Sequence, residues 1–219
     1  AFQITPSTTV RDLMLENDKV KSALTADVNP LRPMKIGTNF FSDGSCSVVM
    51  EVRIFGKGGS LAEVALSYLE AENKIPFAKS VGNVNLSGTK YTGLIVDCSG
   101  LMLNPAMLPS IKIDNGQTIY SHENIDNEKI IANGLVVYTD NATDQISRAR
   151  AGNNPLVVRA IALRDLNATP VISAVDADKI LVANQRDKFF QGEIRGARRA
   201  EQFFQRYESN RKSRANRHS

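Results

Sequence analysis

Apolar residues in this chain come in short runs that are separated by turn-forming residues. The runs at 48–50 and 94–96 have the length of a strand, and no run approaches the length needed to cross a membrane. Asp43-Gly44 and Asn115-Gly116 each stand between two β-prone runs, which is a strong signal of a tight hairpin. The sequence therefore predicts short strands, at residues 34–41, 45–55, 91–97, 110–113, 117–120, 135–138, 156–163 and 171–173.

Apolar residues recur at helical spacing in several segments between these strands. The predicted helices cover residues 10–24, 61–72, 141–151 and 174–190. Ser60 with Glu63 has the spacing of a capping box, which favours a helix beginning at residue 61. Because strands do not alternate regularly with helices, a doubly wound parallel sheet is disfavoured. The predicted fold class is α+β, with small antiparallel sheets (hairpins) and packed helices.

The second strand of the first hairpin alternates apolar and polar residues. Cys46, Val48 and Met50 fall on one face, so this strand is predicted to be half-buried. Cys46 and Cys98 both lie in or next to apolar strands and are interpreted as buried thiols that act as small hydrophobic residues. A disulfide between them stays open as an alternative.

The charge of the chain is unevenly distributed. The 219 residues carry a net charge of +4, but the segment from Gln185 onward holds ten Lys/Arg against four Asp/Glu. The residues before it are therefore slightly acidic. Three regions are predicted: residues 1–75 with helix, hairpin and helix; residues 76–190, rich in β-structure; and residues 191–219, a basic tail that is helical at first and then disordered.

The residues that could carry chemistry have simpler interpretations. The glycine-rich segment 56–60 lacks the spacing of a phosphate-binding loop and is interpreted as a strand-to-helix turn. Asp97, Asp114 and Asp126 lie near turns, and His122 has no orienting partner that the sequence identifies. We therefore predict no catalytic, cofactor-binding or metal-binding residue and no enzymatic activity. A hydrolase that uses Asp97 and His122 is the remaining enzymatic alternative.

Aromatic and basic residues interleave near the C-terminus, and two interpretations of them stay open. The first is a partner-binding surface, which together with the hairpin at 34–55 would mediate assembly. The second is a module that binds an anionic polymer or membrane surface, with nucleic acid disfavoured. The residues predicted to take part are Phe189, Phe190, Arg198, Arg199, Phe203, Phe204 and Tyr207.

Several stretches resemble the small bacterial envelope lipoproteins that include the flagellar outer-membrane protein FlgP. The segment Tyr91-Thr92-Gly93-Leu94-Ile95-Val96-Asp97 is the most specific of them. In place of the small residue and arginine that follow it in that family, this chain has Cys98 and Ser99, and no signal peptide or lipobox is visible. The other matching stretches are residues 8–13, 43–46 leading into 48–56, 100–101, 104–106 with Pro109, 154–160 and 176–180.

The resemblance implies a dodecin-like core with a second β-rich region. It also implies a structural role without catalysis, since no active site is established for the family. The expected location is the periplasm or the outer membrane. The expected partners are further copies of the chain and components of the envelope or the flagellar motor.

Overall fold

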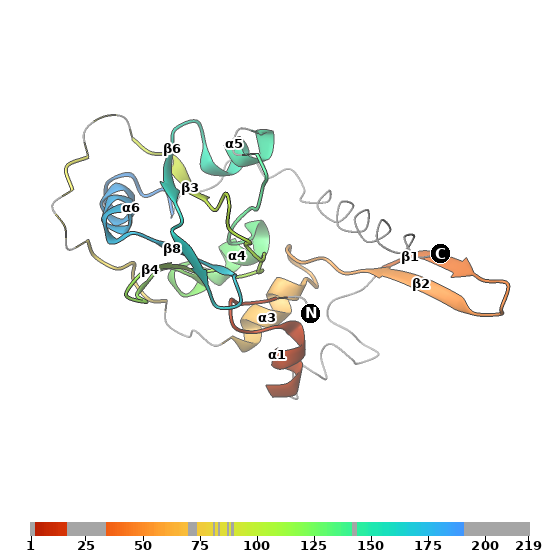
Figure 1. Cartoon of the computed structure of the whole chain (residues 1–219). Helices are drawn as coiled ribbons and strands as arrows, with labels where there is room; N and C mark the ends of the chain where they lie inside the picture. Colours follow the sequence, from red (N-terminus) through yellow and green to blue (C-terminus); the bar gives the residue numbers. More distant parts are fainter. Residues whose placement is uncertain are drawn as a thin grey trace, which may run out of the picture.

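The structure, a computed structural model, describes residues 3–16, 34–69, 74–80, 82, 84–86, 88, 90–141 and 144–190. These residues form an α+β fold with several small sheets (Figure 1). No helix among them is long and apolar enough to span a membrane. The helices are α1 (Val10–Glu16), α3 (Leu61–Tyr68), the 3-10 helix η1 (His122–Asn124), α4 (Asn127–Asn133), α5 (Gln145–Ala151) and α6 (Ala174–Asp187). The strands are β1 (Met34–Phe40), β2 (Cys46–Glu51), β3 (Gly93–Asp97), β4 (Ile111–Ile113), β5 (Thr118–Tyr120), β6 (Pro155–Arg159), β7 (Ala162–Arg164) and β8 (Thr169–Ile172).

The sheets combine antiparallel and parallel pairing, whereas the sequence predicted antiparallel sheets. In the four-stranded sheet, with order β5-β4-β8-β7, the β4/β5 and β7/β8 pairs are antiparallel and β4 runs parallel to β8. β3 and β6 form a separate parallel pair. Only the antiparallel neighbours are joined by tight turns, and turn residues are what the sequence reveals. The parallel pairs join strands that are far apart in the chain, so no short sequence pattern predicts which strands pair.

The structure differs from the sequence-based prediction in two ways between residues 121 and 138. Residues 135–138 do not form the expected strand, and residues 127–133 form α4, a helix that was not predicted. The carbonyl oxygen of Leu135 accepts hydrogen bonds from the Tyr120 hydroxyl at 3.0 Å and from Arg150 Nη2 at 2.8 Å. Side chains therefore take the place of a neighbouring strand at this carbonyl. The signal for α4 was Asp126, whose carboxylate caps the helix by accepting from the Lys129 amide at 3.3 Å.

The hydrophobic core lies where α3, α4 and α6 pack with the four-stranded sheet. Ile119, Ile130, Ile172 and Ile180 are fully buried and come from β5, α4, β8 and α6. α3, from the predicted N-terminal region, contributes Ala62, Ala65 and Leu66 to the same cluster. The predicted N-terminal region and the predicted β-rich region therefore share one core.

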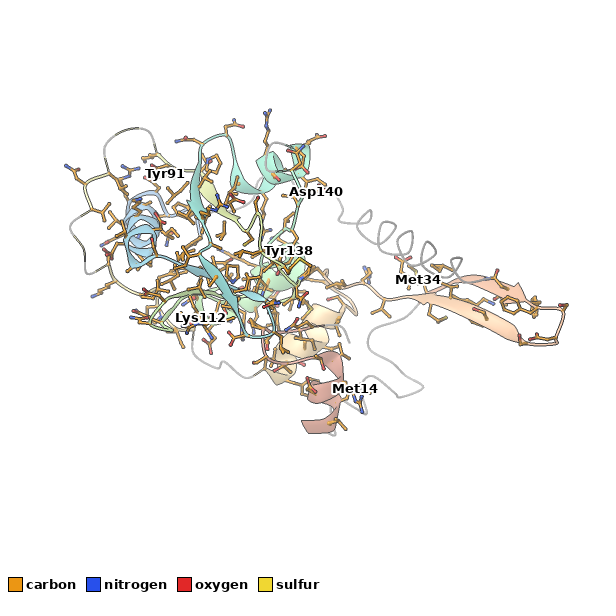
Figure 2. The ribbon with its side chains drawn as sticks, viewed as in Figure 1. Met14, Met34, Tyr91, Lys112, Tyr138 and Asp140 are labelled. Carbon is orange, nitrogen blue, oxygen red and sulfur yellow. The ribbon has the colours of Figure 1, made fainter. Side chains whose placement is uncertain are left out.

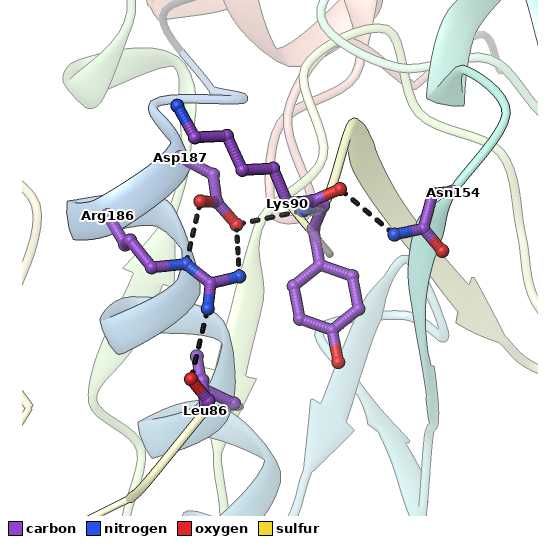
Figure 3. Close-up of polar contacts among 6 residues, drawn as sticks. Leu86, Lys90, Asn154, Arg186 and Asp187 are labelled. Carbon is purple, nitrogen blue, oxygen red and sulfur yellow. Dashed lines mark hydrogen bonds and ion pairs between the residues drawn. The ribbon is translucent and has the colours of Figure 1, made fainter. Parts of the chain in front are cut away.

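A polar clamp ties the end of α6 to the segment that leads into β3 (Figure 3). The Asp187 carboxylate accepts from the Tyr91 amide at 2.8 Å and forms an ion pair with Arg186. Arg186 also donates to the Leu86 carbonyl at 3.1 Å, and Asn154 donates to the Lys90 carbonyl at 2.9 Å. These contacts position the start of β3 beside both α6 and β6.

A second polar contact, at the β7/β8 turn, makes stability depend on pH. Lys112 Nζ lies 2.8 Å from Asp165 Oδ2, which also accepts from the Thr169 hydroxyl at 2.9 Å. The hydrogen bond from Lys112 lowers the pKa of the Asp165 carboxyl below its ordinary value. A carboxyl whose pKa is lower in the folded state stabilises the fold above its unfolded pKa of about 4, and this contribution is lost as the pH falls through the folded pKa.

Asp165→Asn is therefore expected to lower the free energy of unfolding by about 1 kcal/mol near neutral pH. Asn suits the left-handed backbone at this position, where φ is 52°, so the substitution mainly removes the charge. Urea unfolding should show the difference from the wild type narrowing below about pH 4. If the difference in unfolding free energy between the variant and the wild type stayed constant below about pH 4, the charge of Asp165 would not be its cause. Asp114→Asn, in an exposed turn, is the matched control and should change little.

Candidate functional site

β1 and β2 form a two-stranded hairpin that extends away from the other described elements (Figure 1); we call residues 34–51 the arm. Its turn is closed by a hydrogen bond from the Phe41 amide to the Ser45 carbonyl at 3.0 Å. Gly44 has a φ of +82°, in the left-handed region that glycine tolerates best, and the Asp43 carboxylate accepts from the Ser45 amide at 2.9 Å. The Asp43-Gly44 hairpin predicted from the sequence is thus confirmed.

The two faces of the arm differ in character. Opposite residues of an antiparallel pair share a face, and Phe40 pairs with Cys46, Thr38 with Val48, and Lys35 with Met50. This face therefore holds the apolar Phe40, Cys46, Val48 and Met50 together with Thr38 and Lys35, and we call it the apolar face. The opposite face is more polar and holds Met34, Gly37, Asn39, Ser47, Val49 and Glu51.

The apolar face of the arm is exposed. The side chains of Phe40, Val48 and Met50 are 82%, 51% and 50% exposed. Figure 2 shows the arm's side chains, with Met34 near its base, standing apart from the dense packing of the other described elements. The prediction of a half-buried strand is therefore wrong, and Cys46 is an exposed free thiol rather than a buried one. Alternation identified the apolar face, but whether another part of the fold covers a face depends on tertiary packing.

The two edges of the arm are protected unequally. In β1 the register shifts between Lys35 and Gly37, which leaves Ile36 as an extra residue. Bulges and edge lysines are features that discourage a further strand from pairing. β2 pairs without interruption from Cys46 to Glu51 and contains two adjacent β-branched residues. The β2 edge is thus the better template for another strand.

The second predicted surface begins at the end of α6. Phe189 and Phe190 are half-buried, and the ring of Phe190 lies 4.7 Å from that of Tyr120 and 5.2 Å from that of Phe77, centroid to centroid. The Phe190 amide also donates to Asn184 Oδ1 at 2.9 Å. These contacts make Phe190 an intramolecular anchor. The other predicted residues, Arg198, Arg199, Phe203, Phe204 and Tyr207, lie outside the described residues, as does the tail 191–219.

The acidic residues singled out from the sequence support local structure. Asp97 accepts from the Ser99 amide at 2.8 Å, and this interaction with Ser99 lowers the pKa of its carboxyl. His122 begins η1, where burial lowers the pKa of its imidazole. Within the described ranges, no group of three or more His, Cys, Asp or Glu side chains is placed to hold a metal ion.

The glycine-rich segment 56–60 is the strand-to-helix turn that the sequence predicted. The Ser60 hydroxyl caps α3 by accepting from the Glu63 amide at 3.2 Å. The Glu63 carboxylate reaches back to accept from the Gly59 amide at 2.7 Å, which lowers the pKa of that carboxyl. The Gly56 amide donates to the Ile131 carbonyl at 2.6 Å, so the Gly56 and Gly59 amides of this turn already have acceptors within the chain.

The segment from β3 to the residues just after α6 is similar to a known family. Residues 93–193 match the family model described as Treponema pallidum Tp0624, second domain. The match covers just under half of the chain. No curated protein matches it.

The Tp0624-like region contains the four-stranded sheet, the β3/β6 pair, α4, α5 and α6. The arm and α3 precede it in the chain. The exposed apolar face of the arm thus lies outside the part of the chain that the family model describes.

Proposed function

We propose that this protein is a non-enzymatic assembly component of the bacterial cell envelope that associates with copies of itself through the arm. The observation that carries this proposal is the exposed apolar face of Phe40, Cys46, Val48 and Met50 on a projecting hairpin. An isolated two-stranded hairpin is at best marginally stable in water. Exposed apolar surface of this kind marks sites of interaction, so a partner that adds strands or covers this face would stabilise the arm.

The local roles of these acidic residues favour a structural role over a catalytic one. Asp97 and Asp126 accept hydrogen bonds from amides of their own turn and helix, and Glu63 does the same at the start of α3. These are the contacts of turns and helix caps. A reaction centre would instead combine acids and bases from several elements around one space.

The envelope location and a flagellar role are the further parts of this proposal. They are supported by the resemblance of residues 91–97 and of the other matching stretches to the FlgP-containing lipoproteins. The partners would then be other copies of the chain and components of the envelope or motor. Cell fractionation that localises the tagged protein expressed from its own gene tests this part, and recovery in the cytoplasm would contradict it.

Replacing the apolar face by charge tests the role of the arm. Val48→Lys combined with Met50→Lys is expected to weaken self-association by about 100-fold or more, because it removes apolar contacts and sets like charges near each other in the complex. Size-exclusion chromatography with light scattering across a range of concentrations measures this change. The thermal unfolding of the core should stay within about 2 °C of the wild type, because both residues are exposed.

The matched control carries the same charges at equally exposed apolar positions elsewhere. Val157 in β6 is 60% exposed and Val175 in α6 is 63% exposed. Val157→Lys combined with Val175→Lys should leave self-association unchanged. A wild-type protein that remains monomeric at high concentration would contradict the proposal, as would an arm variant that associates as well as the wild type.

A further inference from the structure

We infer that two copies of this chain join through the exposed edges of β2, antiparallel and about a two-fold axis at Val48, so that two arms form one four-stranded sheet. This inference rests on the proposed function, which says that the arm mediates self-association. Beyond the proposed function, this inference specifies which edge of the arm pairs, which residues lie opposite each other and which symmetry relates the two copies. Four strands pass the threshold of about three at which a small sheet with an apolar face becomes stable.

The choice of edge follows from the two strands. β1 carries the irregularity at Ile36 and the charge of Lys35, which both discourage pairing. In β2 only Glu51 is charged, and it is the last residue of the strand. A short segment with β-branched residues and little charge is the kind of edge that pairs with another strand.

The hydrogen bond in the turn decides which groups face the free edge of β2. The Phe41 amide bonds to the Ser45 carbonyl, so these two residues form a hydrogen-bonded pair. Such pairs alternate along an antiparallel ladder, so Ser47 and Val49 direct their backbone groups toward β1. Cys46, Val48 and Met50 then direct theirs toward the free edge.

These outward groups restrict the register of a second β2. Pairing must set Cys46, Val48 and Met50 against the same set in the second copy. The register that uses all of them places Val48 opposite Val48 of the second copy and Cys46 opposite Met50. If one copy shifts by two residues along the other, Val49 lies opposite Val49 of the second copy. Cys46 would then lie opposite a residue beyond the end of β2 in the second copy.

The β2 edge is complementary to itself in the antiparallel register, which favours a second copy as its occupant. In the antiparallel register Glu51 falls opposite Ser45, whereas a parallel register would bring Glu51 beside Glu51. The apolar faces of the two arms also fall on the same side of the sheet, because opposite residues share a face. A lipid surface is disfavoured because Asp43 stands at the tip of the arm next to Phe40 and Phe41.

Disulfide trapping tests the register. In a background with Cys46→Ala and Cys98→Ala, Val48→Cys is expected to give a disulfide-linked dimer with dioxygen and a copper–phenanthroline catalyst. Opposite Cα atoms of a hydrogen-bonded pair lie about 5.5 Å apart, within the range of about 4.4–6.8 Å that a disulfide spans. Non-reducing electrophoresis measures the linked fraction, and circular dichroism checks that the variant is folded.

Val49→Cys in the same background is the matched control. Val49 would lie opposite Ser47 of the second copy, so the two introduced thiols are offset by two residues, about 7 Å, along the strands. The linked fraction should be at least about 10-fold lower than for Val48→Cys, because the Cα separation then exceeds about 7 Å. Native Cys46, tested with Cys98→Ala alone, should also link poorly, since it would face Met50.

The outcomes separate this inference from the proposed function. Preferential linking through Val49→Cys or native Cys46 would overturn the register. An oligomer that links through none of these positions would overturn edge pairing and leave assembly through another surface. A monomer that binds vesicles of anionic lipid through the arm would overturn both the inference and the proposed self-association.

Discussion

Gly93→Ala is expected to lower the free energy of unfolding by about 3 kcal/mol, at the upper end of the usual cost of overpacking. Gly93 is buried at the start of β3, and a Cβ added there would lie 2.6 Å from the Ala151 carbonyl oxygen and 2.7 Å from its Cα. Both atoms belong to the backbone at the end of α5, so no side chain can move aside. β3 and α5 would have to separate.

That separation would also strain the contacts around it. The Thr92 hydroxyl donates to the Ala151 carbonyl at 2.7 Å, and the Asn154 amide donates to the Thr92 hydroxyl at 3.0 Å. Chemical denaturation monitored by circular dichroism measures the loss, which corresponds to a lower melting temperature by roughly 6–12 °C.

Gly37→Ala is the matched control for Gly93→Ala. Gly37 also lies in a strand, but a Cβ there would meet Val49 at 3.9 Å, an ordinary van der Waals distance. Its substitution is expected to be neutral or slightly stabilising, because alanine restricts the unfolded chain more than glycine does. Equal losses for the two variants would show that the backbone contact with Ala151 is not the cause.

Arg150→Ala is expected to lower the free energy of unfolding by about 3 kcal/mol, because it removes the side-chain donor of two carbonyls and one of the two donors of a third, Leu135, which keeps the Tyr120 hydroxyl. The guanidinium donates to the carbonyls of Asn133 at 2.8 Å, Gly134 at 2.7 Å and Leu135 at 2.8 Å, at the end of α4. Burial lowers the pKa of this arginine. A hydrogen bond from a charged donor contributes about 1.5–3 kcal/mol to stability. The expected loss is smaller than the total for these bonds, because water can hydrate part of the exposed carbonyls after the substitution.

The same helix supplies the control for this variant. Arg148 is exposed on α5, so Arg148→Ala should change stability by less than about 0.5 kcal/mol. Hydrogen exchange gives a second measurement, because loss of Arg150 should raise the exchange of amides around residues 133–135 more than elsewhere. Similar stability for both variants would contradict the capping role of Arg150.

The proposed assembly surface was partly predictable from the sequence. The Asp43-Gly44 turn and the alternation of Cys46, Val48 and Met50 predicted a hairpin with one apolar face, and the structure has both. The sequence also suggested this hairpin as an assembly surface, which stays a prediction. What it could not reveal was exposure, because an apolar strand face that packs on its own core has the same pattern as one that packs on a partner.

Local signals alone determined the α+β class, both tight hairpins and the Ser60 cap of α3, since turns, caps and side-chain alternation depend on residues a few positions apart. Contacts between distant parts of the chain decided the rest. The parallel pairing of β3 with β6, the Arg150 contacts that replace a strand at Leu135, and the packing of Phe190 on Tyr120 belong to this group. Each depends on which elements meet in space, and many partners would satisfy the same local pattern.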